Sequence, residues 1–335
     1  DPLEVTEQYG TDAVRMALMR GAAPGTDIAI GEDNFESARA FANKIWNAFR
    51  LVNGWTAEKI PTPEESKVAS SWFAARLNEA LMEIEDHFSK YRISDALHAL
   101  YKLIWDDFCS WYLEIVKPEF GKPIDKVTFD LTTFYFEKLL AALHPFMPFI
   151  TEELWHELNG RSEDECIIVA SYPVSGTYDS SILSDAIFAF DIVKEIRNTR
   201  NTKNLSPKEA LNLLVKQSGN PRDSQFWPVV RKLANLNEIS FVTAAPATNA
   251  TSFLLRSTEF FIPLVGKVDE AKEREAILKE ISYQKGFLAI VDKKLGNEKF
   301  VNTAPPRVVE SERRKKADAE AKISALEESL TRISL

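Results

Sequence analysis

The sequence predicts a mainly α-helical protein, built as an antiparallel helical bundle with a small α/β appendage and a C-terminal antiparallel coiled-coil hairpin. Three patterns predict this fold. Apolar residues recur at helical spacing through five long segments, short β-prone runs follow them, and a heptad pattern occupies the end of the sequence. A length of 335 residues is large for one core, so more than one domain is expected.

Four parts are expected along the chain. The opening DPLEVTEQYG has no core element before it, and its Pro2 and Gly10 predict a loop that enters a helix. An irregular, glycine-punctuated stretch follows over residues 20–34. Residues 1–32 are therefore interpreted as a remnant that links to a missing part of the protein, and the sequence as a fragment. The helical bundle is expected over 33–205, the α/β appendage over 206–265 and the hairpin arm over 266–335.

The bundle helices are predicted from apolar stripes. Stripes at helical spacing run through residues 70–91, 93–117, 131–158 and 180–204, and the modest connections between them favour antiparallel packing. The first stripe, in residues 36–52, consists of Ala38, Phe41, Ile45, Ala48 and Val52.

Helix ends are predicted from capping residues and prolines. Ser94 is predicted to be the N-cap of the third bundle helix and Pro118 to stop it. Pro145 and Pro148 are expected to interrupt or kink the fourth helix, since proline cannot donate the backbone hydrogen bond that a helix interior requires.

The appendage is predicted from a change of pattern after Pro207. The runs EALNLLVK, EISFVT and EFFIPLVG are rich in apolar and β-prone residues. The run SQFWPVVRKLANL, between the first two, has helical spacing. We therefore expect three strands and one helix in this part.

The arm is predicted from two heptad seams of similar length. They lie on either side of Pro305 and Pro306, and Pro306 suits the first turn of a helix. Two such seams around a proline turn predict two helices that fold back on each other. The first seam consists of Ile277, Ile281, Gln284, Leu288, Val291 and Leu295, and the second of Ala319, Ile323, Leu326, Leu330 and Ile333.

Charge is distributed unevenly along the chain. The formal net charge is −9, but Lys267–Leu335 holds 15 Lys or Arg against 13 Asp or Glu. The first 266 residues hold the other 26 basic and 37 acidic side chains. Basic residues grouped in an acidic protein favour a polyanionic partner at those places.

Patterns for catalysis and metal binding are lacking. The sequence has no glycine-rich phosphate-binding motif, its four histidines show no zinc spacing, and its two cysteines stand apart. Cys109 is expected to be a core thiol. We predict no catalytic residue, no metal ligand and no cofactor site in this sequence. The absence of a leader and of a membrane-length apolar run favours a cytoplasmic location.

Three polar clusters are candidate binding sites. The arm cluster can neutralise phosphates, although a charge run is more often a solvated helix face. The helix-end cluster continues past the basic last turn that a helix dipole alone would explain. The edge cluster places Asn within a helix, which indicates a neighbouring helix or unstacked bases as partner. The arm cluster is Lys293, Lys294, Lys299, Arg307, Arg313, Arg314, Lys315 and Lys316; the helix-end cluster is Lys194, Arg197, Arg200 and Lys203; the edge cluster is Arg39, Asn43, Asn47 and Arg50.

Several segments resemble valyl-tRNA synthetases in sequence and order. The bundle segments are also shared with the isoleucyl and leucyl enzymes, whereas the hairpin segment is similar to the valyl enzymes in particular. The segments are DPLEVTEQYGTDAVRMAL, ESARAFANKIWNAFR, WDDFCSWYLEIVKP, LHPFMPFITEELW, IRNTRNTKNLSP and KLGNEKFVNTAPPRVVESER.

The resemblance implies a truncated class I aminoacyl-tRNA synthetase. Residues 1–32 would be a remnant that links to its missing catalytic domain. The bundle would be its anticodon-binding domain, and the hairpin would be an arm that lies on the tRNA body. The full enzyme would join valine to its tRNA with ATP and magnesium. The Lys-Met-Ser-Lys-Ser and His-Ile-Gly-His signatures of that chemistry are absent here. The piece is therefore expected to bind valine-accepting tRNA as a catalytically inactive monomer, through all three clusters.

Two alternatives stay open at this point. The chain could be the equivalent region of an isoleucyl enzyme, although that family often ends in a cysteine-rich zinc element and this sequence has two isolated cysteines. The heptads could instead pair with another chain, which would make the arm a protein-interaction module.

Overall fold

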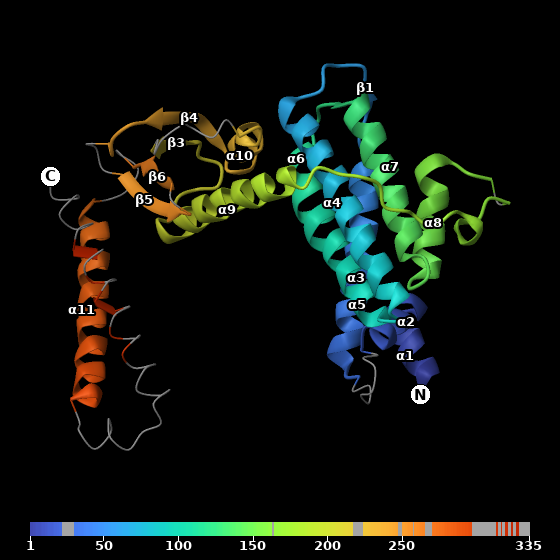
Figure 1. Cartoon of the computed structure of the whole chain (residues 1–335), viewed down its shortest axis with the longest axis horizontal. Helices are drawn as coiled ribbons and strands as arrows, with labels where there is room; N and C mark the ends of the chain where they lie inside the picture. The colour runs from blue at the N-terminus through green and yellow to red at the C-terminus, as the bar shows by residue number, and fades with distance from the viewer. Residues whose placement is uncertain are drawn as a thin grey trace. The chain divides into compact units, whose positions relative to one another are not determined.

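The structure is a computed structural model, in which the chain divides into two compact units (Figure 1). The first unit is Asp1–Ile196 with Arg222–Leu236, and the second is Arg197–Pro221 with Asn237–Leu335. The structure describes residues 1–21, 30–162, 164–216, 224–246, 250–256, 258–264 and 270–296, together with residues 313, 316, 319, 320, 323, 326 and 327.

The first unit opens with two helices, α1 (Pro2–Tyr9) and α2 (Thr11–Gly21), where the sequence predicted a loop over residues 1–10 that enters a helix. The predicted loop was wrong because local signals start α1. The Asp1 carboxylate accepts a hydrogen bond from the Leu3 amide (2.9 Å), and Pro2 occupies the first turn. Gly10, at φ 91°, separates the two helices.

The next two helices are α3 (Glu32–Asn53) and α4 (Glu64–Ser89). Every residue of the stripe predicted for α3 is buried, so the predicted core face is confirmed. Figure 1 shows α3, α4 and α5 running alongside one another in the bundle. The short strand β1 (Ala57–Glu58) follows α3 and pairs in parallel with β2 (Ile124–Asp125).

The third predicted helix contains a long π-helical segment. It is divided into α5 (Ile93–Lys102), the π-helical stretch Leu103–Tyr112 and α6 (Leu113–Val116). The prediction that Ser94 is the N-cap was wrong, because the helix begins at Ile93 with Arg92 at the cap position. The predicted stop before Pro118 is confirmed.

The fourth predicted helix is interrupted at the prolines, as expected. It consists of α7 (Lys126–Leu143) and α8 (Pro148–Asn159). The amino end of α8 is capped from α2: the Asp12 carboxylate accepts hydrogen bonds from the amides of Phe149 (3.2 Å) and Ile150 (2.7 Å). The helix α9 (Ser181–Thr202) follows the 3₁₀ turn Ile167–Val169, and its residues up to Ile196 belong to this unit, as does α10 (Trp227–Leu233).

An aromatic cluster forms the centre of the bundle. The ring of Phe73 lies 4.9 Å from that of Tyr112 and 5.2 Å from that of Tyr135, measured between centroids. The hydroxyl of Tyr112 is hydrogen-bonded to Thr132 (2.9 Å), and that of Tyr135 donates to the Ser70 carbonyl (3.0 Å). Because both hydroxyls have partners, the cluster can be buried without the cost of unpaired polar groups.

The second unit contains a four-stranded sheet in the order β4-β3-β6-β5. The strands are β3 (Leu211–Lys216), β4 (Leu236–Val242), β5 (Ala250–Leu255) and β6 (Thr258–Pro263). β6 is antiparallel to both β3 and β5. The prediction missed β5, because its Ala-Thr-Ser opening lacks the apolar run that marked the other three strands.

The arm begins with α11 (Glu270–Leu295). Two ion pairs join α11 to described helical residues near the end of the chain. Lys285 pairs with Glu327, and Asp292 pairs with Lys316, both at 2.8 Å. The residue later in α11 thus pairs with the residue earlier in the second stretch.

Candidate nucleic-acid interface

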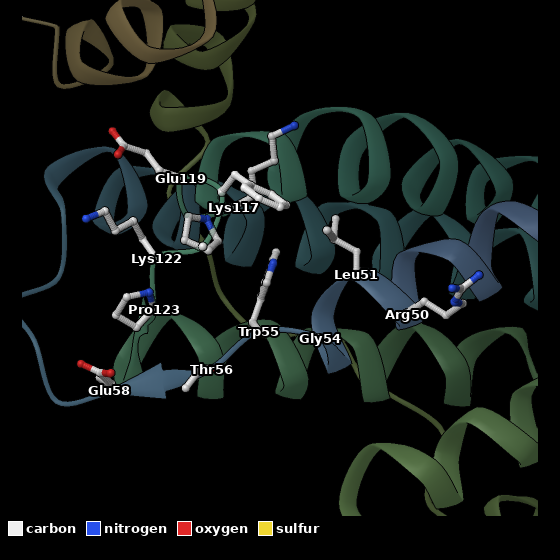
Figure 2. Close-up of a pocket in the computed structure, with 13 residues that line it drawn as sticks. Arg50, Leu51, Gly54, Trp55, Thr56, Glu58, Lys117, Glu119, Lys122 and Pro123 are labelled. Carbon is white, nitrogen blue, oxygen red and sulfur yellow. The ribbon is translucent and has the colours of Figure 1, made fainter.

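A pocket of about 830 Å³ lies at one end of the bundle (Figure 2), and we call it the bundle-end pocket. Two chain segments line it. The first is the end of α3 with the turn that follows, from Arg50 to Glu58, and the second is the α6–β2 loop, Lys117–Pro123. Figure 2 shows Trp55 between the α3 side, with Arg50, and the loop side, with Lys117 and Lys122.

Backbone hydrogen bonds fix the two walls of this pocket to each other. The pairing of β1 with β2 joins Ala57 to Ile124, and the Ile124 amide donates to the Thr56 carbonyl (2.9 Å). Within the α6–β2 loop, the Lys122 amide donates to the Glu119 carbonyl (2.9 Å). Gly121 completes that turn at φ 76°, a conformation that side chains disfavour.

The chemistry of the bundle-end pocket suits unpaired bases. Phe120 is fully exposed and Trp55 half-buried, so aromatic faces are available for stacking. Arg50, Lys117 and Lys122 supply positive charge around them. The sequence predicted Arg50 but missed the aromatic residues, because they lie in connections that helical periodicity does not describe.

The edge cluster on α3 is divided between two places. Arg50 lines the bundle-end pocket, whereas Arg39 and Asn43 line a 270 Å³ hollow against the α1–α2 turn. The guanidinium of Arg39 donates to the Gln8 carbonyl (3.1 Å), so a neighbouring helix is its partner in this structure. Asn47 is exposed on the same face of α3.

An exposed tryptophan on this face was missed by the prediction. Trp46 is 41% exposed and lies three or four residues from Asn43 and Arg50, hence on the same side of α3. Its indole could have been found from the sequence, because helical spacing places it opposite the buried stripe of Phe41, Ile45 and Ala48.

The helix-end cluster contains one residue that cannot serve as predicted. Arg200 is only 5% exposed, and its guanidinium donates to the carbonyls of Ser206 (2.8 Å) and Glu209 (2.7 Å). Loss of hydration lowers the pKa of this side chain. The prediction that Arg200 contacts tRNA is therefore corrected: its hydrogen bonds fold the segment after α9 onto the helix end.

The other members of the helix-end cluster lie nearer to solvent. Lys194 and Arg197 are exposed, and Lys194 forms an ion pair with Asp191 (3.1 Å). Lys203 is half-buried in the turn after α9. Asn204 ends the helix in the left-handed conformation (φ 52°), as expected for a residue after a helix terminus.

The arm cluster is described in part. Lys293 and Lys294 are exposed in the last turn of α11, and Arg313 is exposed in the second helical stretch. Lys316 is half-buried, and its ion pair with Asp292 raises its pKa. Lys316 therefore contributes to joining the two stretches. Lys299, Arg307, Arg314 and Lys315 lie outside the described residues.

An apolar stripe on the outer side of α11 is a further feature that the prediction missed. Tyr283 is 67% exposed and Ile290 59% exposed, and Phe287 lies between them at helical spacing. This side differs from the seam, where Ile277, Ile281 and Val291 are buried. Exposed lysines flank the stripe, with Lys279 four residues before Tyr283 and Lys294 four residues after Ile290.

Two observations concern metal and thiol chemistry in the part of the chain that the structure describes. His, Cys, Asp and Glu side chains do not gather there in groups of three or more that could hold a metal ion. Burial raises the pKa of the Cys109 thiol to about 12, which makes it inert. Of the described helices, none has the length and apolar character needed to cross a membrane.

Comparison with known families gives two matches, at the bundle and at the arm. Residues 70–215 match the anticodon-binding domain of tRNA ligases. Residues 269–334 match the tRNA-binding arm of valyl-tRNA synthetases. The first match places the bundle in the class of tRNA ligases with a helical anticodon-binding domain. The second match is specific to the ligases for valine.

Curated relatives agree with these matches. The valine–tRNA ligase of Christiangramia forsetii is 46% identical over all of this chain, and that of Parabacteroides distasonis is 48% identical over all of it. The valine–tRNA ligase of Clostridium perfringens is 35% identical over 94% of the chain. The chain belongs to the valine–tRNA ligase family. It spans about 38% of the length of the first two relatives and corresponds to their C-terminal part.

Proposed function

We propose that this chain is the tRNA-binding part of a valine–tRNA ligase, which attaches valine to its tRNA with ATP and magnesium in the cytoplasm. The chain contributes affinity and orientation, and the chemistry belongs to the rest of the enzyme. The observation that carries the proposal is the bundle-end pocket, where aromatic faces and three cations line one hollow in a domain of the anticodon-binding family.

The two binding regions have different tasks in this proposal. The bundle-end pocket accepts splayed anticodon bases, which stack on Trp55 and Phe120 while Arg50 supplies polar contacts. The arm is an antiparallel coiled-coil hairpin whose lysines and arginines contact the tRNA backbone and set the register. The apolar stripe of α11, near Lys279 and Lys294, provides a surface for an exposed base or sugar.

A protein-interaction role for the heptads is disfavoured by the ion pairs within the chain. Lys285–Glu327 and Asp292–Lys316 join the two stretches of the arm to each other, and Ile281 and Ile323 are already buried. A second chain would have to replace this packing. We therefore propose that the protein binds tRNA as a monomer.

The test is a binding titration of the chain with valine-accepting tRNA at several salt concentrations. We expect binding that weakens as salt rises, because phosphate contacts release counterions. We also expect no exchange of pyrophosphate with ATP. Binding that is insensitive to salt, or equal for every tRNA in a competition panel, would overturn the proposal.

A further inference from the structure

A lysine from α10 is bound to the wall of the bundle-end pocket. The ammonium group of Lys232 donates to the Lys117 carbonyl (3.1 Å) and lies 3.5 Å from a carboxylate oxygen of Glu65 in α4. Lys117 directly follows Val116, the last residue of α6, and opens the α6–β2 loop. Carbonyls at the end of a helix lack donors within the helix, and a lysine there satisfies one of them.

The position of Lys232 is fixed by packing. Its helix is held by Phe226, Val229 and Val230, all fully buried, and the ring of Phe226 meets that of Phe190 edge-on at 6.4 Å. Loss of hydration lowers the pKa of Lys232, against the opposing charges of Glu65 and of Glu119 in the α6–β2 loop. The ammonium group thus lies between α4 and that loop, in a side chain that is 30% exposed.

The α6–β2 loop is consequently held at both of its ends. Its far end is fixed by the Ile124–Thr56 hydrogen bond and the pairing of β1 with β2. Its near end is fixed by the Lys232–Lys117 hydrogen bond. Between these ends lies Phe120, whose exposed ring is available to a ligand.

We infer that Lys232 is a positioning residue for the bundle-end pocket, which it serves by fixing the start of the loop that carries Phe120 and Lys122. This inference rests on the proposed function for what the pocket binds. The inference gives α10, which carries Lys232 and lies between β3 and β4 in sequence, a role in anticodon discrimination. This helix comes after the last bundle helix in the sequence. A role in general stability, by contrast, would affect all ligands and the whole unit equally.

The experiment compares three variants of the full chain. Lys232→Met removes the donor and keeps the length of the side chain, and Lys232→Arg restores a cationic donor. Lys67→Met is the matched control, because it removes a lysine from the surface of α4 that pairs only locally, with Glu64 (2.6 Å). Two quantities are measured: hydrogen exchange of the loop amides 119–122 and 124 without RNA, and the ratio of affinities for valine tRNA and for a copy with a changed anticodon.

We expect Lys232→Met to accelerate loop exchange and to lower the affinity ratio about tenfold, the size of one charge-assisted hydrogen bond. Lys232→Arg and Lys67→Met should leave both the rate of loop exchange and the ratio of affinities unchanged. The inference is overturned if loop exchange is unchanged in Lys232→Met, or if Lys67→Met has the same effect. If the unchanged chain does not bind tRNA, the proposed function fails, whereas loop exchange still decides whether Lys232 positions the loop.

Discussion

The bundle-end pocket and the arm hold their cations in different ways. Arg50, Lys117 and Lys122 surround aromatic rings in a hollow whose walls are fixed by strand pairing and by buried groups. In the arm, the described lysines lie on an open helical surface, and the contacts between its two stretches include solvent-exposed ion pairs. A pocket can select a base by its shape only if its walls are rigid. A phosphate, by contrast, is attracted by any exposed positive charge.

The same comparison separates cations that stabilise the fold from cations available to a ligand. Arg197 and Arg200 lie three residues apart near the end of α9, yet the first is exposed and the second buried. Both residues are arginines on the same side of α9, so residue type and helical spacing do not distinguish them. Burial and hydrogen bonding decide which arginine stabilises the fold.

The largest effect is expected from Arg200→Met. The change leaves two carbonyls, of Ser206 and Glu209, without their charged donor, which should cost about 2 kcal/mol of unfolding free energy. Urea titrations followed by circular dichroism measure this loss. Arg197→Met is the matched control at an exposed position and should cost clearly less stability while weakening tRNA binding. Equal stability of the two variants would contradict the assignment of Arg200 to the fold.

A second large effect is expected from removing the exposed arm cations. Replacing Lys293, Lys294 and Arg313 by Ala should weaken tRNA binding about tenfold at low salt and reduce the slope of log K against log salt by about 2–3. The control removes three lysines that pair with acids in the bundle, Lys67, Lys90 and Lys126. If the control flattens the salt dependence equally, net charge rather than the arm is responsible.

A smaller effect, but a more selective one, is expected from Phe120→Ala. Loss of one stacking surface should weaken binding of an anticodon stem-loop by about 1–2 kcal/mol. The ring is fully exposed, so the stability of the chain should not change. Tyr91→Ala removes another exposed aromatic ring, in the turn between α4 and α5, and should bind the stem-loop normally. Calorimetric titration distinguishes the two variants.

The smallest effect is expected from Asp292→Asn, which breaks the pair with Lys316. Solvent reaches both side chains, which are 39% and 46% exposed, so the helicity of the arm should be nearly unchanged. Loss of the negative charge should slightly strengthen tRNA binding, because Lys316 becomes available to a phosphate. Weaker binding together with reduced helicity would mean that the pair is needed to close the arm.

The bundle was predictable wherever helical spacing alone decides the structure. The stripe of α3 and the interruption at Pro145 and Pro148 follow from side-chain periodicity and from the missing amide of proline. The π-helical stretch Leu103–Tyr112 was not predictable in this way, because it keeps an apolar, helix-like composition while the backbone hydrogen bonds shift by one residue.

The candidate site was predictable only in part, because it depends on contacts between distant residues. Arg50 was found from its place on a helix edge, but Phe120 reaches the same pocket through the pairing of β1 with β2. Arg200 was assigned to the surface because its acceptors, Ser206 and Glu209, lie beyond the helix that periodicity describes. Lys232 carries no local signal and is recognised only by its hydrogen bond to Lys117.

The most direct test measures the salt dependence of two ligands on the unchanged chain, whole valine tRNA and its isolated anticodon stem-loop. Whole tRNA engages the arm as well as the bundle-end pocket, so its affinity should fall steeply with salt, by a slope of about −0.7 to −0.9 for each phosphate contacted. The stem-loop should give a clearly shallower slope and should depend on Phe120. Equal slopes for the two ligands, with no effect of Phe120→Ala on either, would contradict the division of tasks between the pocket and the arm.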